Sequence, residues 1–280
     1  MKHPEKWRET IDPFSLPYKH FRPTEILGYP HAGNDVFHAR GIYHGEEVTA
    51  FVKAARYEGK TIENEVALLN RLQAPMIPKV IDCGFDGTPF SVTLELPGER
   101  LSVIVGENKE LASLAYMEEY GAALAKLHQL HIPAEPVKDR RFFHTPGEEL
   151  LNSLGLEQLR PFFSRPPASK ACCFCHGDFH YANILWKDGR LSGMLDFELA
   201  GYGNRDFDIA WAIFRRPGQK FLKTELEREA FLSGYSRFGA FDQEAVRFYM
   251  AQCYVYFLRF SGDDGEYREY AADWLKGIQS

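Results

Sequence analysis

The pattern of apolar residues changes at Pro97-Gly98, and this change constrains the fold class more than any other feature. Before it, short segments of alternating or β-branched residues are separated by glycine and charged turns, a pattern typical of β-strands. These segments are residues 25–29, 36–43, 47–54, 79–84 and 90–96. After it, residues 111–130 and most of 217–279 have the spacing of helices. We therefore predict an α+β protein with a small sheet-rich lobe at 1–97 and a larger, mainly helical lobe at 98–280.

The composition of the chain argues against nucleic acid and membranes as binding partners. The chain has 280 residues, a net charge of −6 and a hydrophobic fraction of 45%. Nucleic-acid-binding proteins usually carry a basic excess, so no nucleic acid partner is expected. No run of about 18 apolar residues occurs, so no membrane partner is expected either. The amino terminus lacks the apolar core of a signal peptide, and we expect a cytoplasmic protein with no obligate protein partner.

The cysteines allow two interpretations. Cys172, Cys175 and His176 have the residue types of three zinc ligands. A structural zinc site normally takes four ligands from two separated clusters, and the sequence shows no second pair. The interpretation we favour is that Cys173 and Cys175 are reduced, small buried hydrophobes in an apolar segment. The sequence thus requires no zinc.

A β-hairpin is predicted between residues 184–186 and 191–195. Asp188-Gly189 lies between these two apolar segments, and Asp-Gly in that position is a strong hairpin signal. A turn there brings Asn183 and Asp196 to the same end of the two strands. Asp178 lies on the segment just before the hairpin.

The residue types gathered there suit phosphoryl transfer. Carboxylate and amide oxygens are ligands that Mg²⁺ prefers, and Asn183 and Asp196 supply them. Phosphoryl transfer also needs a carboxylate that orients the attacking hydroxyl and accepts its proton, a task that suits Asp178. Taken singly, Asp178 and Asn183 are better explained as turn or cap residues. The spacing of Asp178, Asn183 and Asp196, taken as a set, favours the functional interpretation.

The sequence resembles a known family at these positions. His176-Gly177-Asp178, then Asn183, then Asp196-Phe197-Glu198 are similar to the signature of the aminoglycoside phosphotransferase and choline kinase family. The resemblance implies a bilobal protein-kinase-like fold and transfer of the γ-phosphoryl group of ATP or GTP to a hydroxyl of a small molecule. It also implies that Asp178 is the catalytic base and that Asn183 and Asp196 hold Mg²⁺.

The resemblance extends to nucleotide binding in the first lobe. Lys53 ends the strand predicted at 47–54, where relatives carry a lysine that contacts the α- and β-phosphates and pairs with a helix glutamate. Apolar residues recur every three or four positions over 61–73, which predicts that helix. Glu63 and Glu65 are both candidates for the pairing, and Glu65 is favoured by the apolar residues that follow it.

Other positions are assigned less directly by the resemblance. Residues 31–35, with Gly33 and Asn34, have the place of a loop covering the phosphates, although the sequence is also ordinary turn chemistry. Glu95 and Leu96 have the place of the hinge, where backbone groups bind an adenine edge. Glu198 is interpreted as a second metal ligand or a substrate contact.

Four further residues are interpreted as structural. Asp208 resembles the buried aspartate that supports the catalytic loop through its backbone amides. His176 and His180 are expected to hold that loop by hydrogen bonds rather than to act as acids or metal ligands. His128 resembles the end of a family helix and is expected to be packed.

The phosphate acceptor is left open by the sequence. Tyr202 and Asp206 follow the metal-binding motif and are candidates for the border of an acceptor pocket. Asp263, Asp264 and Glu266 would attract an amine-bearing acceptor, but a polar turn explains them better. Two alternative functions make different demands on the sequence. A noncatalytic nucleotide-binding module should lack the base, the lysine or a metal ligand, and a protein kinase should have a longer segment after the metal motif.

Overall fold

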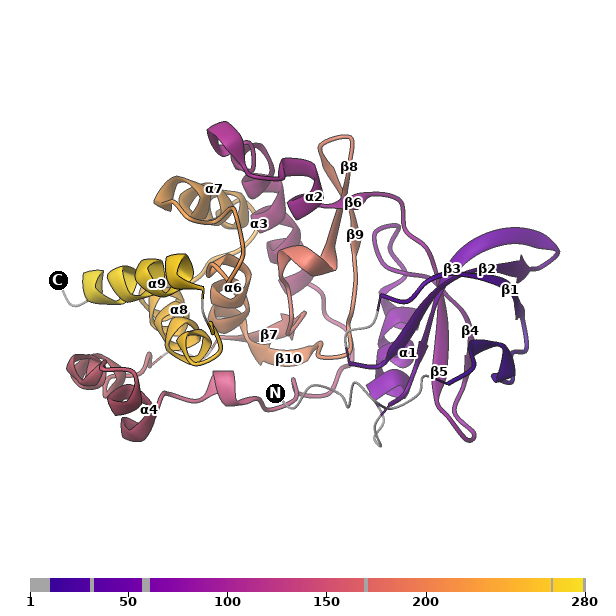
Figure 1. Ribbon diagram of the computed structural model, residues 1–280, viewed down its shortest axis with the longest axis horizontal. Helices are drawn as coiled ribbons and strands as arrows, with labels where there is room; N and C mark the ends of the chain where they lie inside the picture. The colour runs from indigo at the N-terminus through magenta and orange to yellow at the C-terminus, as the bar shows by residue number, and fades with distance from the viewer. Residues whose placement is uncertain (1–10, 31–32, 57–60, 169–170, 263, 279–280) are drawn as a thin grey trace. The chain divides into compact units, whose positions relative to one another are not determined.

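The chain forms two compact units in a computed structural model that describes residues 11–30, 33–56, 61–168, 171–262 and 264–278 (Figure 1). The first unit is Met1–Gly98 together with Ser192–Leu199, and the second is Glu99–Leu191 together with Ala200–Ser280. We predicted a single boundary at 97/98. The structure adds a second segment, Ser192–Leu199, to the first unit. None of the helices among the described residues combines the length and apolar character of a membrane-spanning segment.

The first unit contains a five-stranded antiparallel sheet in the order β1-β2-β3-β5-β4. Its elements are η1 (Pro13–Ser15), β1 (Phe21–Gly28), β2 (Asp35–Tyr43), β3 (Glu46–Ala54), α1 (Thr61–Leu72), β4 (Val80–Gly84) and β5 (Phe90–Leu94). All five predicted strands are present. β1 begins four residues earlier than predicted; it contains Pro23, which an edge strand tolerates beside a register shift.

Alternation along β3 separates the core from the site. Ala50 and Val52 are buried on one face, where they pack with Phe21 and Phe90 in the main core of the unit. Successive side chains of a strand point to opposite faces, so Lys53 lies on the other face. The core thus fixes the strand that carries the lysine.

The second unit consists of helices and short strands. Its strands form one three-stranded sheet, β6-β8-β9, and one antiparallel pair, β7 with β10. The strands are β6 (Glu99–Arg100), β7 (Cys172–Cys175), β8 (Ile184–Lys187), β9 (Arg190–Met194), whose last residues belong to the first unit, and β10 (Gly201–Asn204). The helices are α2 (Leu101–Val105), η2 (Lys109–Leu111), α3 (Leu114–His128), η3 (Arg141–Phe143), α4 (Glu148–Ser153), η4 (Glu157–Leu159), α5 (Arg160–Phe163), η5 (Tyr181–Asn183), α6 (Arg205–Ile213), α7 (Glu225–Ser236), α8 (Gln243–Leu258) and α9 (Gly265–Gly277).

The predicted turn at Asp188-Gly189 connects β8 and β9. Both residues have positive φ, 51° for Asp188 and 74° for Gly189. Positive φ at both central residues is the requirement of a type I′ hairpin turn, whose twist matches that of the strands. The local sequence therefore explains the hairpin without reference to the rest of the fold.

Helices α3 and α7 pack with their backbones in close approach. A Cβ atom on Gly121 of α3 would lie 1.9 Å from the Phe231 carbonyl oxygen, and one on Gly234 of α7 would lie 1.9 Å from the Glu118 carbonyl oxygen. Only glycine leaves room for this contact. The contact also brings the end of α3, at His128, to the end of α7.

Candidate active site

The loop between β7 and β8 is fixed by a carboxylate from α6. Asp208 is buried and accepts hydrogen bonds from the backbone N–H groups of His176, at 2.9 Å, and Gly177, at 3.1 Å. Gly177 has φ +77°, which glycine adopts without strain. This geometry supports the interpretation of Asp208 as structural support for the loop.

Asp178, the next residue in this loop, receives hydrogen bonds from two side chains. The Trp211 indole N–H donates to Oδ1 at 2.7 Å, and the Asn183 amide donates to Oδ2 at 3.3 Å. The Asn183 amide also donates to the Asp178 carbonyl oxygen at 3.0 Å, which leaves its side-chain oxygen for another ligand. The His180 imidazole lies 3.5 Å from Oδ2, and its other nitrogen accepts from the Ala182 N–H.

Two arginines add positive charge around Asp178. Arg216 is buried and donates to the Trp211 carbonyl oxygen at 2.7 Å, and Arg140 donates to the Gly177 carbonyl oxygen. Their guanidinium groups lie 4.9 Å and 4.8 Å from the Trp211 ring centroid. Burial works to raise the pKa of Asp178, but the hydrogen bond and charge of His180 and the charges of both arginines hold that pKa well below its usual range. Asp178 is therefore ionised at neutral pH.

A second charged group lies within the first unit. The Lys53 ammonium is 2.8 Å from Glu65 and 2.9 Å from Asp196, with Glu198 at 3.5 Å. The lysine thus pairs with Glu65 of α1 rather than with Glu63. Glu65 also accepts a hydrogen bond from the Phe197 N–H at 3.0 Å, which connects α1 to the Asp196-Phe197-Glu198 motif.

The charges in this group suit a divalent cation. One oxygen each from Glu65, Asp196 and Glu198 lie within 4.8 Å of one another, and Lys53 is their shared cationic contact. Burial raises the pKa of Glu65 and of Glu198, and repulsion from Asp196 acts in the same direction. A bound Mg²⁺ would relieve this excess of negative charge. Asp196 also has φ 62°, an uncommon conformation for a residue other than glycine.

The other predicted nucleotide contacts also lie in the first unit. The Asn34 amide donates to Glu198 at 3.1 Å, beside Gly33, while His31 and Ala32 of the predicted loop lie outside the described residues. The Glu95 N–H donates to the Thr49 carbonyl oxygen at 3.1 Å. This N–H is therefore already used within the sheet, and an adenine edge is left with the carbonyl of Glu95 and the backbone of Leu96.

The structure describes two separate groups of predicted site residues. Lys53, Glu65, Asn34, Asp196 and Glu198 gather in the first unit. The loop residues from His176 to Asn183 gather with Asp208 in the second unit. The sharing of one cation between Asn183 and Asp196 stays a prediction.

The residues considered for acceptor binding have structural partners. Asp206 is buried and bonded to Arg205, and Tyr202 pairs with Phe174 in the β7–β10 ladder. Asp264 caps α9 by accepting from the Tyr267 N–H.

Glu266, in the first turn of α9, is held by two cations. It pairs with Arg215 at 2.8 Å and with Lys223 at 2.7 Å. These contacts, with the capping by Asp264, favour the polar-turn interpretation of the acidic segment. Asp263 lies outside the described residues.

Sequence reasoning missed three residues around Asp178: Trp211 and Arg140, which donate to Asp178 and Gly177, and Arg216, which donates to Trp211. Trp211 lies three positions after Asp208, one helical turn further along α6, so a helix through Asp208 gives a weak signal for it. Arg140 lies in an irregular segment and Arg216 just after α6, and neither belongs to a recognisable motif.

The family model described as "Phosphotransferase enzyme family" matches residues 34–249 of the chain. No curated protein matches the chain in a sequence search.

Solved structures with similar folds cover nearly the whole chain. The amicoumacin kinase hAmiN, in complex with AMP-PNP, Ca²⁺ and Ami, gives a TM-score of 0.63 at 13% identity, over 93% of this chain and 90% of its own. Aminoglycoside phosphotransferase APH(4)-Ia gives 0.59 at 16% identity, over 91% and 93%. Choline kinase from Cryptosporidium parvum gives 0.56 at 15% identity, over 92% and 88%. The kinase-like α+β fold expected from the sequence is confirmed.

Proposed function

Because the chain belongs to the phosphotransferase enzyme family, we propose that it transfers the γ-phosphoryl group of a Mg²⁺-bound nucleoside triphosphate, ATP or GTP, to a hydroxyl group of a small molecule. Asp178 is the proposed catalytic base. Asn183 and Asp196 are the proposed metal ligands. Lys53, oriented by Glu65, is the proposed phosphate contact.

The observation that carries this proposal is the set of hydrogen bonds that hold Asp178 and its loop. The Trp211 indole and the Asn183 amide donate to its two oxygens. Although burial acts to raise its pKa, His180 and the two arginines hold that pKa below its usual range, which favours the ionised form. The loop on which it lies is bonded to Asp208. A carboxylate with these properties can orient an acceptor hydroxyl and take its proton as the hydroxyl attacks phosphorus.

The charged group of the first unit supports the nucleotide part of the proposal. When bound, Mg²⁺ neutralises charge on the phosphates. Asp196 offers a carboxylate to such a cation, Glu198 is a further ligand or a substrate contact, and Glu65 pairs with Lys53 at 2.8 Å. Gly33, Asn34, Glu95 and Leu96 are proposed to line the nucleotide.

The acceptor is proposed only as a small hydroxylated molecule. Asp264 and Glu266 could attract an amine-bearing acceptor, but Asp264 caps α9 and Glu266 pairs with Arg215 and Lys223. An amine group therefore has no support from these residues, and amines are one class among several to be screened.

The experiment that tests the proposal is the substitution Asp178→Asn. Asparagine keeps the shape of the side chain and removes the base, so turnover should fall by at least about 1,000-fold, while binding of the Mg²⁺ nucleotide is kept. Turnover is measured as acceptor-dependent ADP release, and nucleotide binding by calorimetry. Asp188→Asn is the matched control, because asparagine is well suited to that turn.

The acceptor itself is sought by screening hydroxylated amines, sugars, nucleosides and antibiotics for ADP release. Asp196→Ala serves as the blank, since it should lose Mg²⁺-dependent activity. Full activity of Asp178→Asn on a true acceptor would remove Asp178 from its role. Nucleotide binding without turnover across the whole screen would favour the noncatalytic module.

A further inference from the structure

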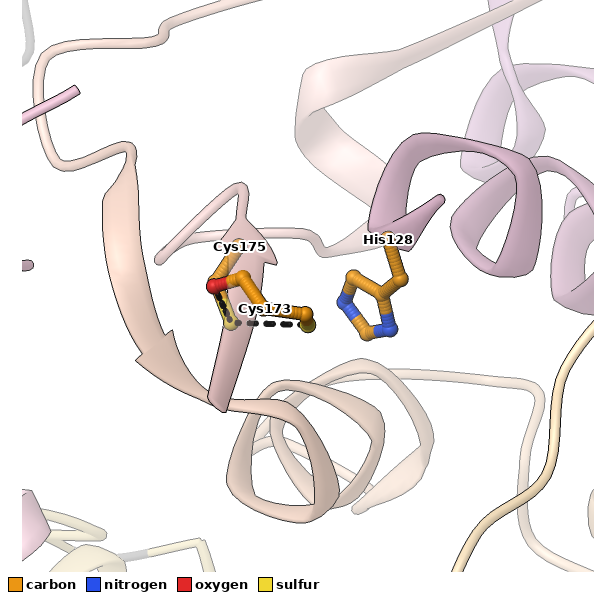
Figure 2. A group of neighbouring side chains, drawn as sticks. All are labelled: His128, Cys173 and Cys175. Atoms are coloured by element: carbon orange, nitrogen blue, oxygen red, sulfur yellow. Dashed lines mark hydrogen bonds between the residues drawn. The ribbon is translucent and has the colours of Figure 1, made fainter. Parts of the chain in front are cut away.

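Two cysteines and one histidine of the second unit place their ligand atoms together, and none of the three is assigned above as base, metal ligand or nucleotide contact. One nitrogen of His128 and the sulfurs of Cys173 and Cys175 lie within 4.8 Å of one another. Figure 2 shows the imidazole ring facing the Cys173 sulfur, with Cys175 beside it on the same strand. His128 and Cys175 are buried and Cys173 is half-buried.

The local structure explains why these three residues meet. Residues i and i+2 of a strand point to one face, so Cys173 and Cys175 of β7 share a face and Cys172 faces the other way. The exposure of Cys172 agrees with this. His128 arrives from the last turn of α3. The zinc interpretation weighed against in the sequence would have used Cys172, Cys175 and His176, so only Cys175 belongs to both sets.

The sulfur positions fit a tetrahedral cation. The two sulfurs are 3.7 Å apart. Two Zn–S bonds of about 2.3 Å at the tetrahedral angle place their sulfurs about 3.8 Å apart. Thiolate and imidazole are the ligands that select zinc over magnesium or calcium. From this geometry we propose that His128, Cys173 and Cys175 form a Zn²⁺ site, with a water molecule at the fourth position.

The imidazole is already oriented by partners of the kind found around metal sites. Its Nδ1 lies 2.7 Å from the Tyr235 hydroxyl, and its Nε2 lies 3.1 Å from Asp208. One nitrogen exchanges its partner for the cation, and the other keeps its partner and holds the ring. A histidine ligand is commonly held through its second nitrogen by a carboxylate or a similar acceptor.

Access and proton balance are compatible with binding. Cys173 is half-buried, so it offers the cation and its water a way in from solvent. Cysteine ligates zinc as the thiolate, so the two thiols lose their protons on binding and the protons pass to solvent. In the metal-free chain the same atoms satisfy one another, with the two sulfurs in contact and the Cys175 thiol directed at the Cys173 carbonyl oxygen at 3.6 Å.

The test uses the full chain, reduced and freed of metal, and the metals alone as probes. Titration with Co²⁺ should give thiolate-to-cobalt charge-transfer absorbance that saturates at one equivalent and is abolished by Zn²⁺. Cys173→Ser should weaken Zn²⁺ binding at least about 100-fold, because changes outside the ligand shell already cost about 10–100-fold. Cys172→Ser, one position away on the opposite face, is the matched control and should bind as the wild type does.

Two results would overturn the proposal. One is a wild-type chain that shows no thiolate-to-cobalt absorbance, and the other is a Cys173→Ser variant that binds Zn²⁺ as tightly as Cys172→Ser. The site does not depend on the proposed phosphotransferase activity, because its readouts are absorbance and metal binding. His128→Gln gives a second test if a serine variant misfolds, and folding of each variant is checked by circular dichroism.

Discussion

The Asp178 carboxylate is contacted both by residues of its own loop and by a residue from a helix further along the chain. The loop itself provides Asn183 and His180, while α6 provides Trp211. The indole N–H is the shortest of these contacts, at 2.7 Å to Oδ1. Since Trp211 touches neither nucleotide nor acceptor in our proposal, it is a positioning residue, and its contribution should be visible in the kinetics.

Trp211→Phe keeps an aromatic ring between the two arginines and removes only the indole N–H. A hydrogen bond to a charged group contributes about 1.5–3 kcal/mol, so kcat should fall by about tenfold or more, with the KM for nucleotide unchanged. Loss of this donor should also raise the pKa of Asp178, which moves the acidic limb of the kcat–pH profile upward. Trp274→Phe, on α9, is the control. An unchanged kcat and pH profile would show that the contact does not position the base.

At the scale of elements, the approach of α3 and α7 depends on two glycines. Gly121 and Gly234 each face a backbone carbonyl of the other helix. Ordinary helix pairs are separated by their side chains, about 8–10 Å between axes. Here the absence of a side chain allows direct backbone contact, and the same contact brings Tyr235 to His128.

Gly121→Ala should destabilise the protein by on the order of 3 kcal/mol, because the new methyl group meets backbone that cannot rotate away. The free energy of unfolding in urea measures this. Gly277→Ala, where a Cβ meets nothing within 4 Å, is the control and should be close to neutral. A Gly121→Ala variant as stable as that control would contradict the close packing.

The start of α7 is held by one buried carboxylate. Glu227 completes a capping box with Thr224 and also accepts hydrogen bonds from the Ser113 hydroxyl, at 2.6 Å, and the Leu222 N–H, at 2.7 Å. Burial acts to raise the pKa of Glu227, but these hydrogen bonds outweigh it and lower that pKa.

The pH dependence of stability follows from the direction of this shift. A carboxylate with a lowered folded-state pKa contributes stability above its unfolded pKa and loses it as pH falls through the folded value. Unfolding free energy should therefore fall with acid below about pH 4.5, and Glu227→Gln should show a shallower fall. Glu229→Gln, at an exposed position of the same helix, is the matched control. Equal slopes for Glu227→Gln and wild type would exclude Glu227 as a source of the acid sensitivity.

At the scale of the whole molecule, the first unit is built from two separate segments of the chain. Ser192–Leu199 returns to it from the second unit, and it is bonded there through Met194 N–H to the Met76 carbonyl and through Phe197 N–H to Glu65. The segment that carries Asp196 therefore shares the stability of the sheet-rich unit, although it lies more than 90 residues further along the chain.

Native-state hydrogen exchange should reveal this membership. The amides of Met194 and Phe197 should exchange with the same opening free energy as those of β3 and β5, because cooperative units exchange together. The amides of β8, which precede them by only a few residues, serve as the comparison within the second unit. Exchange of Met194 and Phe197 together with β8 instead would assign the segment to the second unit.

The sequence by itself determined the strands, turns and helices that depend on residues close together in the chain. The strand pattern predicted the strand that ends at Lys53, Asp-Gly predicted the hairpin, and apolar spacing predicted α1 with Glu65 on it. These features rest on backbone sterics and periodicity, which act over a few residues.

The tertiary structure alone decided which distant side chains meet. It placed Trp211, Arg140 and Arg216 around Asp178, bonded the Glu95 N–H within the sheet, and joined His128 rather than His176 to the cysteines of β7. Such contacts depend on how helices and strands pack, and packing is set by side-chain shape over the whole unit. Apart from the weak signal that the helical spacing from Asp208 gives for Trp211, spacing along the chain does not carry that information.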